Sequence, residues 1–197
     1  VESARLPMNY WMLVTNPENF AVTKRLKFEV QGFSKRQKRK TDRMAPGDRL
    51  LFYVTGWRVF ALTATLQSTT FRDTSPLWTS HKTEETFPHR VRIRLTIMPP
   101  EDKLLDALEI APRLEYVRRW PPDRWPLAFE DELHLLPRRD FELIEGEILR
   151  LLGKSPEGAI SKPLGQVNNK RRRTRQPRST TSEDLPSDDT VHTEVQP

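Results

Sequence analysis

Four stretches of the chain carry the hydrophobic pattern of β-strands. Asn9–Val14 is rich in aromatic and branched side chains and runs into Thr15-Asn16-Pro17, residues that favour turns. Leu50–Val54 and Trp57–Leu66 are apolar runs separated by a Thr-Gly turn, which predicts a hairpin. Val91–Ile97 alternates apolar and polar residues, as a half-buried strand does. We therefore predict a strongly bent sheet or barrel of mostly antiparallel strands.

Helical patterns are fewer and shorter. Pro17–Val22 follows the first strand, and Asp102–Ala107 is a second short candidate. Pro137–Leu152 has the clearest helical spacing, because its apolar residues recur every three or four positions and proline suits a helix start. Short helices beside antiparallel strands predict an α+β fold.

Composition divides the chain into one domain and two flanking segments. Residues 153–197 contain no Phe, Trp or Tyr and are rich in Pro, Ser, Thr and charged residues. Such a segment buries too little apolar surface to offset the entropy of ordering it. We expect an N-terminal extension at residues 1–7, a folded domain at residues 8–152, and a disordered charged tail at residues 153–197.

Several classes of protein fit the composition poorly. The chain has no cysteine, and its four histidines show no metal-ligand spacing, so we expect no metal, no cofactor and no thiol nucleophile. The longest apolar runs are much shorter than a bilayer-spanning helix requires. We therefore expect no membrane association and a cytoplasmic location.

The net charge of +6 is concentrated in basic clusters. Lys24–Arg43 contains nine Lys and Arg residues, and Lys170–Arg178 contains six. Clusters of this kind attract the phosphate backbone of nucleic acids without reading its sequence. A solvated basic face is the alternative interpretation.

Five motifs together resemble one known family. NYWMLVTNPENF begins at Asn9, KRLKFEV at Lys24, APGDRLLFYV at Ala45 and FPHRVRIRL at Phe87, and LPRRDFELI follows Arg118-Arg119-Trp120. In this order they resemble the EVE domain, a PUA-like family related to the YTH readers of methylated adenine. The resemblance covers residues 8–150. It implies a PUA-like pseudo-barrel with flanking short helices and a pocket for one nucleobase swung out of its strand.

The resemblance also implies two sets of binding residues. A flipped base needs aromatic walls for stacking and polar groups for its edge, while cations hold the flanking phosphates. The nucleobase set is Thr15, Asn16, Phe28, Tyr53, Trp57 and Trp78. The backbone set is Lys35, Arg36, Lys38, Arg39, Lys40, Arg118 and Arg119.

Some of these residues also fit structural roles. Phe28 and Tyr53 suit a hydrophobic core as well as a base cage. Asn16 suits a helix N-cap as well as a base contact.

Three functions are consistent with the sequence. The first is a reader that binds a modified base, in DNA or RNA, without catalysis. The alternatives are a general RNA-binding PUA-like protein and the recognition subunit of a modification-dependent restriction system, with a nuclease as partner.

An enzyme is the competing class. Glu84-Glu85 and Glu130-Asp131-Glu132 group carboxylates, but they lie in polar surroundings without a histidine arrangement. We interpret them as solvated acids and predict no catalytic residue.

Overall fold

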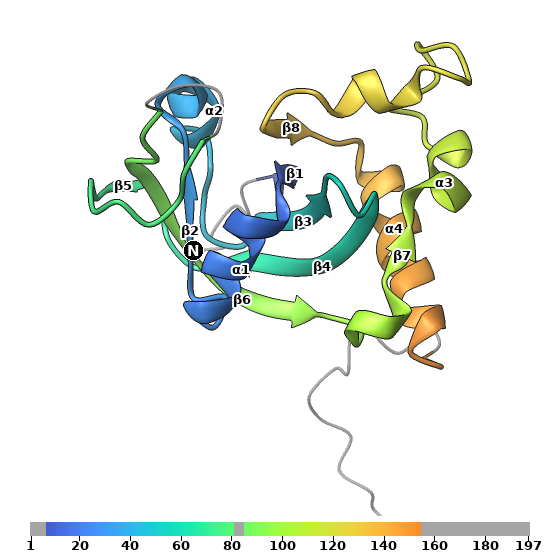
Figure 1. Cartoon of the computed structure of the whole chain (residues 1–197), viewed down its shortest axis with the longest axis horizontal. Helices are drawn as coiled ribbons and strands as arrows, with labels where there is room; N and C mark the ends of the chain where they lie inside the picture. The colour runs from blue at the N-terminus through green and yellow to red at the C-terminus, as the bar shows by residue number, and fades with distance from the viewer. Residues whose placement is uncertain (1–6, 81–84, 155–197) are drawn as a thin grey trace, which may run out of the picture. The chain divides into compact units, whose positions relative to one another are not determined.

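A computed structural model describes residues 7–80 and 85–154 of the chain. The segments predicted for residues 1–6 and 155–197, most of the N-terminal extension and of the charged tail, lie outside the described residues. The described part contains an eight-stranded sheet (Figure 1). Its strands are β1 (Tyr10–Thr15), β2 (Val30–Phe33), β3 (Arg49–Val54), β4 (Val59–Leu66), β5 (Phe71–Arg72), β6 (His89–Ile97), β7 (Leu105–Asp106) and β8 (Leu133–Leu135).

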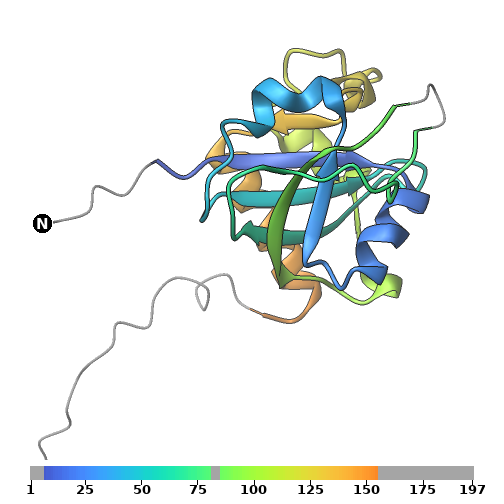
Figure 2. The same cartoon turned by 90° about the vertical axis from the view of Figure 1, so that its left-hand side faces the viewer.

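The sheet is mixed and curled. Its strands follow the order β2-β6-β4-β3-β1-β8, with β5 beside β6 and β7 beside β4. β1 runs parallel to β3, and the other pairings of the described strands are antiparallel. Register shifts interrupt the β3–β4 and β4–β6 ladders, and such irregularities bend a sheet and increase its twist. Figure 2 shows the curled strands from the side, and the predicted fold class is confirmed.

Short helices and 3-10 turns connect these strands. They are α1 (Pro17–Arg25), η1 (Lys35–Gln37), α2 (Lys38–Thr41), η2 (Glu101–Lys103), α3 (Ala107–Ile110), η3 (Ala111–Arg113), η4 (Trp125–Phe129) and α4 (Arg138–Leu151). Within residues 7–80 and 85–154, no helix is both long enough and apolar enough to cross a bilayer.

The prediction of a helix at Asp102–Ala107 is wrong. Leu105 and Asp106 form strand β7 against β4, and the helix α3 begins only at Ala107. Asp106 causes this boundary, because its side chain accepts the backbone N–H of Leu108 (2.9 Å) as an N-cap.

The central strands are buried on both faces. Met12 and Leu51 face one apolar cluster, which includes Phe141 and other residues of α4. Their neighbours along the strands, such as Trp11, face a second cluster that includes Phe20 of α1. Because successive strand residues point to opposite faces, burial of both faces explains the continuous apolar runs in the sequence. The indole of Trp11 donates to the buried carboxylate of Asp48 (2.9 Å).

Candidate functional site

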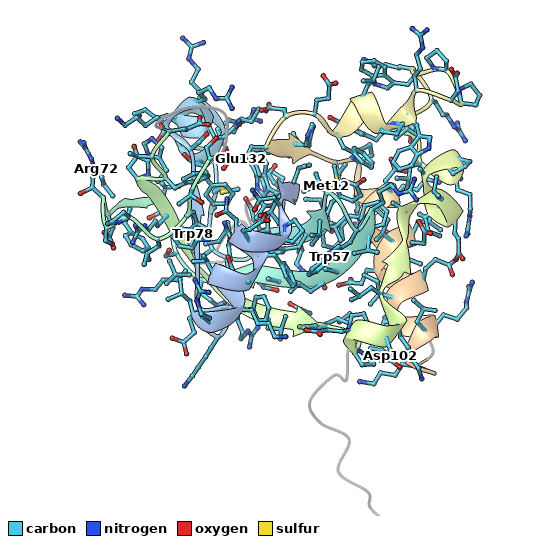
Figure 3. All side chains as sticks on the ribbon, viewed as in Figure 1. Met12, Trp57, Arg72, Trp78, Asp102 and Glu132 are labelled. Atoms are coloured by element: carbon cyan, nitrogen blue, oxygen red, sulfur yellow. The ribbon has the colours of Figure 1, made fainter. Side chains whose placement is uncertain are left out.

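A pocket of about 270 Å³ lies where β1 ends and α1 begins. Its walls come from these two elements, from β2, from residues 78–80 and 85–87, and from the loop before β8. Figure 3 labels Trp78 and Glu132, which reach this pocket from distant parts of the sequence. Typical small-molecule sites occupy about 300–1,000 Å³, so this pocket suits one compact group rather than an extended ligand.

Amide side chains form the polar wall. Asn16 caps α1, since its Oδ1 accepts the backbone N–H of Asn19 (2.8 Å). Asn19 in turn donates from Nδ2 to the carbonyl of Thr79 (2.7 Å) and accepts the N–H of Thr79 at Oδ1 (3.0 Å). These bonds tie residues 78–80 to α1, and both asparagines line the pocket.

Trp78 is held in the pocket lining by several contacts. Its side chain is only 3% exposed, and its Nε1 donates to the hydroxyl of Thr23 (3.0 Å). The Thr23 hydroxyl donates to Oε1 of Gln31 (2.8 Å), another lining residue. Gly32 packs so closely that a Cβ added to it would lie 2.4 Å from Cε3 of Trp78. The indole therefore contributes a fixed, mostly covered surface, and the partly exposed Phe87 supplies the second aromatic side chain.

A buried arginine supports the segment that carries Trp78. Arg90 of β6 is 2% exposed, and its guanidinium lies 5.1 Å from the Trp78 ring centroid. It donates to the carboxylate of Asp73 (2.5 Å), to the hydroxyl of Ser75 (2.9 Å) and to the Ser75 carbonyl. These charge-assisted bonds order residues 73–78 around the indole.

The pocket mouth is acidic. Glu85, Glu130, Asp131 and Glu132 line it, and Arg36 is the one Lys or Arg among its described lining residues. Arg36 is bonded to Glu85 (2.7 Å), and Lys40 is bonded to Asp131. Within the described residues, no group of three or more acidic or histidine side chains is placed to hold a metal ion. The prediction that these carboxylates are all solvated is wrong for Glu85 and Glu132, which are partly buried.

Glu132 is the most perturbed of these acids. Burial, together with the charges of Glu85 and Asp131, raises the pKa of Glu132 to about 7, although hydrogen bonding from Ser34 opposes this rise. By contrast, bonds from Lys40, the Glu132 N–H and Gln37 outweigh burial and lower the pKa of Asp131. Near neutral pH the Glu132 carboxyl is therefore divided between its neutral and ionised forms.

A second, cationic cleft lies on the other side of η1 and α2. It has a volume of about 440 Å³, and its charged or titratable lining residues are Lys35, Lys38, Arg72, His89 and one acid, Asp42, which pairs with Lys38. The ring of Phe71 also lines it. Burial, reinforced by Lys38 and Arg72, lowers the pKa of His89 despite the opposing charge of Asp42. Figure 3 labels Arg72 at this side of the molecule.

Four predicted residues meet at the acidic pocket. They are Thr15, Asn16, Trp78 and, from the backbone set, Arg36. Lys35 and Lys38 line the cationic cleft instead. Arg39 is exposed on α2, and Arg118 and Arg119 are exposed on the turn after η3, away from the residues that line either cavity.

The structure places the other three predicted aromatic residues elsewhere. Phe28 and Tyr53 are 6% and 4% exposed in the two core clusters, where Tyr53 packs against Phe60 and Phe129. Trp57 is 48% exposed in the β3–β4 turn, with its ring edge-on to Phe20 at 5.8 Å. None of the three is among the described lining residues of the pocket.

Sequence reasoning missed Asn19, Gln31, Phe87 and Glu132 as pocket residues. Phe87 and Glu132 lie within motifs that were noticed, but nothing local in the sequence indicates that they face a cavity. Asn19 carried one usable signal, because a residue one helical turn after a capping asparagine lies on the same side of the helix.

Known proteins resemble this chain in sequence and fold. The sequence model of the EVE domain matches residues 9–120. A UPF0310 protein of Pyrococcus abyssi is 27% identical over 70% of this chain and 98% of its own length. A UPF0310 protein of Pyrococcus horikoshii is 28% identical over 72% of this chain and its whole length.

A solved structure extends the comparison to the fold. The YTH domain of a Zygosaccharomyces rouxii protein, in complex with N6-methyladenosine RNA, superposes with a TM-score of 0.51 at 12% identity. The superposition covers 75% of this chain and 92% of that one, and at this identity it shows a shared fold. Because the family match spans more than half of the sequence, this chain belongs to the EVE domain family.

Proposed function

We propose that this protein binds nucleic acid and receives one flipped, modified nucleobase in the pocket between β1, α1 and β2, without catalysing a reaction. The observation that carries this proposal is a compact pocket whose lining combines the amide side chains of Asn16, Asn19 and Gln31 with the rings of Trp78 and Phe87. Amide side chains read a base edge because they both donate and accept, and rings stack on its face.

The YTH-like fold supports the same function. The Zygosaccharomyces rouxii YTH domain was solved with N6-methyladenosine RNA. The similarity in fold supports binding of a modified base, and in this proposal the side chains of the chain's own pocket decide which base binds. DNA and RNA are both candidates for the strand, and a nuclease partner would make the protein a recognition subunit.

The cationic cleft supports a path for the strand. Arg36 lies at the pocket, whereas Lys35 and Lys38 line the neighbouring cleft, so the short η1–α2 segment borders both cavities. Phosphates on one side of a flipped nucleotide would lie against these cations while the base occupies the pocket. A cytoplasmic location is part of this proposal.

Phe87→Ala tests whether the base binds in this pocket or elsewhere on the surface. Phe87 is partly exposed and lies outside both core clusters, so its removal should leave the fold intact. Loss of one base–aromatic contact worth about 1–3 kcal/mol should weaken binding of the preferred modified oligonucleotide by about fivefold to about 150-fold. Fluorescence polarisation at fixed salt, with oligonucleotides that differ only in one base modification, measures this change.

Trp57→Ala is the matched control. It removes a larger and more exposed aromatic side chain that does not line the pocket. The affinity of this variant for the modified oligonucleotide should equal that of the protein without substitutions. If Trp57→Ala abolishes the base preference and Phe87→Ala preserves it, the base binds elsewhere.

A further inference from the structure

Glu132 is fixed between two strands at the edge of the pocket. Its carbonyl accepts the N–H of Val14 in β1 (2.8 Å), and its carboxyl Oε1 accepts the N–H of Ser34 just after β2 (2.9 Å). Figure 3 labels its side chain. Since both ends of the residue are bonded, the carboxyl has a defined orientation in the pocket wall.

The two oxygens of this carboxyl have different surroundings. The Ser34 N–H donates to Oε1 (2.9 Å), no described residue stands in hydrogen-bond geometry to Oε2, and the nearby Ser34 hydroxyl limits the rise in the pKa of the carboxyl without cancelling it. An oxygen that accepts a hydrogen bond is the weaker site for a proton, so in the neutral form the proton lies on Oε2. The free Oε2–H is then available to a ligand in the pocket.

The surrounding charges favour this neutral form. Glu85, Glu130 and Asp131 line the same pocket from the two loops that border Glu132. The nearby cations are Arg36 of η1, bonded to Glu85, and Lys40 of α2, bonded to Asp131. Burial, together with the charges of Glu85 and Asp131, raises the pKa of Glu132 to about 7 against the opposing hydrogen bonds from Ser34, so the neutral form is well populated at physiological pH.

We propose that neutral Glu132 is a specificity-determining residue that donates Oε2–H to the acceptor ring nitrogen of a flipped cytosine or adenine. Oε1 retains a lone pair, which accepts from the neighbouring exocyclic amino group of the same base. This proposal rests on the proposed function, because it requires the pocket to hold a base. It adds the class of base that binds and the protonation state of Glu132 in the complex.

The hydrogen-bonding groups of the bases explain why cytosine and adenine are the expected ligands. Cytosine presents the acceptor N3 beside an amino group, and adenine presents the acceptor N1 beside an amino group. Thymine, uracil and guanine carry an N–H at the corresponding ring position, which requires an acceptor instead. Neutral Glu132 offers one donor and one acceptor side by side, which matches the first class, whereas the ionised form offers acceptors alone.

Binding should therefore depend on pH. Because complex formation needs the proton on Glu132, affinity should be highest below about pH 7 and fall about tenfold for each pH unit above it. Glu132→Gln offers one donor and one acceptor at every pH, because the amide Nε2 donates where Oε2–H would and the amide Oε1 accepts from Ser34. This variant should bind with the low-pH affinity at every pH.

Fluorescence polarisation with single-stranded thymidine and uridine tracts tests the proposal. Each tract carries one central cytosine, 5-methylcytosine, adenine or N6-methyladenine, and an unsubstituted tract serves as the reference. The protein is titrated into each tract at about pH 6 and at about pH 8. The unmodified protein should prefer the cytosine or adenine class and lose about tenfold or more in affinity at the higher pH. Glu132→Gln should keep the preference and lose the pH dependence, while the control Glu109→Gln, which removes an exposed acid of α3 outside the pocket lining, should retain both.

Two results would overturn the inference, and they differ from failure of the proposed function. An unchanged pH dependence in Glu132→Gln, or a preference for the unsubstituted tract, would remove Glu132 from base selection while Phe87→Ala still weakens binding. Equal affinity for every tract, with Phe87→Ala and Glu132→Gln both without effect, would overturn the pocket as a base site and this inference with it.

Discussion

At the scale of single residues, Gly32 determines where Trp78 sits. A Cβ at this position would lie 2.4 Å from Cε3 and 2.6 Å from Cζ3 of the indole. The indole cannot easily move away from an added Cβ, because it donates a hydrogen bond to Thr23 and lies next to the guanidinium of Arg90. The glycine is therefore required by close packing against the pocket wall.

Gly32→Ala should lower the free energy of unfolding by about 1–3 kcal/mol, the usual cost of overpacking a buried site. Chemical denaturation measures this change, and the displaced indole should also weaken oligonucleotide binding. The matched control is Gly146→Ala in α4, where an added Cβ has no neighbour within 4 Å. Helix propensity predicts that this control is stabilised by about 0.5–1 kcal/mol. Equal stability of the two variants would contradict the packing argument.

Residue-level prediction from sequence succeeded where local chemistry decides the position. Asn16 and Thr15 follow a strand and begin a helix, so their place at the strand end could be predicted from the turn motif. Phe28 could not be assigned, because its backbone adopts a positive φ of 55° that turns the ring into the core. Glu132 was misjudged because it is placed by tertiary contacts, such as the bond from the Ser34 N–H, with residues far away in sequence.

At the scale of elements, Asp48 joins the start of β1 to the turn before β3. Its carboxylate accepts the backbone N–H of Asn9 (2.9 Å), the indole N–H of Trp11 (2.9 Å) and the N–H of Ala45 (3.2 Å). The parallel pairing of β1 with β3 begins next to this carboxylate, with Tyr10 opposite Arg49. Asp48 therefore helps to set the register of β1 against β3, and the opposite end of β1 carries Thr15.

Asp48→Ala should lower the free energy of unfolding by about 3 kcal/mol, since several donors would be left without their charged acceptor. Denaturation monitored by tryptophan fluorescence measures this loss. The control Asp42→Ala removes an exposed acid paired with Lys38 and should cost less than about 0.5 kcal/mol. A small effect at Asp48 would mean that the β1–β3 pairing does not depend on this carboxylate.

Prediction of elements from the sequence was most accurate for long periodic segments. The strands β1, β3 and β6 and the helix α4 were predicted within about two residues, because hydrophobic periodicity reports burial directly. The segment Leu105–Asp106 was assigned wrongly to a helix. Its pairing with β4 is a tertiary contact, and a strand of two residues is too short to show a periodic pattern in the sequence. The β4 strand starts at Val59, which leaves Trp57 in the turn.

At the scale of the whole described domain, charge is divided between two neighbouring cavities. The pocket between β1, α1 and β2 is acidic at its mouth, whereas the cleft beyond η1 and α2 is lined by Lys35, Lys38 and Arg72. An acidic pocket disfavours a phosphate and favours a group that donates protons or hydrogen bonds. The arrangement is consistent with a base in the first cavity and its backbone near the second.

The location of the bound base is the central claim, and the tryptophan indole signals test it directly. The chain has five tryptophans, of which Trp78 lines the pocket and Trp57 lies outside it. We would record proton–nitrogen NMR spectra while adding an oligonucleotide with one 5-methylcytosine or N6-methyladenine, and assign the two signals with Trp57→Phe and Trp78→Phe. We expect the Trp78 signal to shift with saturation while the Trp57 signal stays in place. A shift of Trp57 with Trp78 unchanged would place the base outside this pocket and contradict the account.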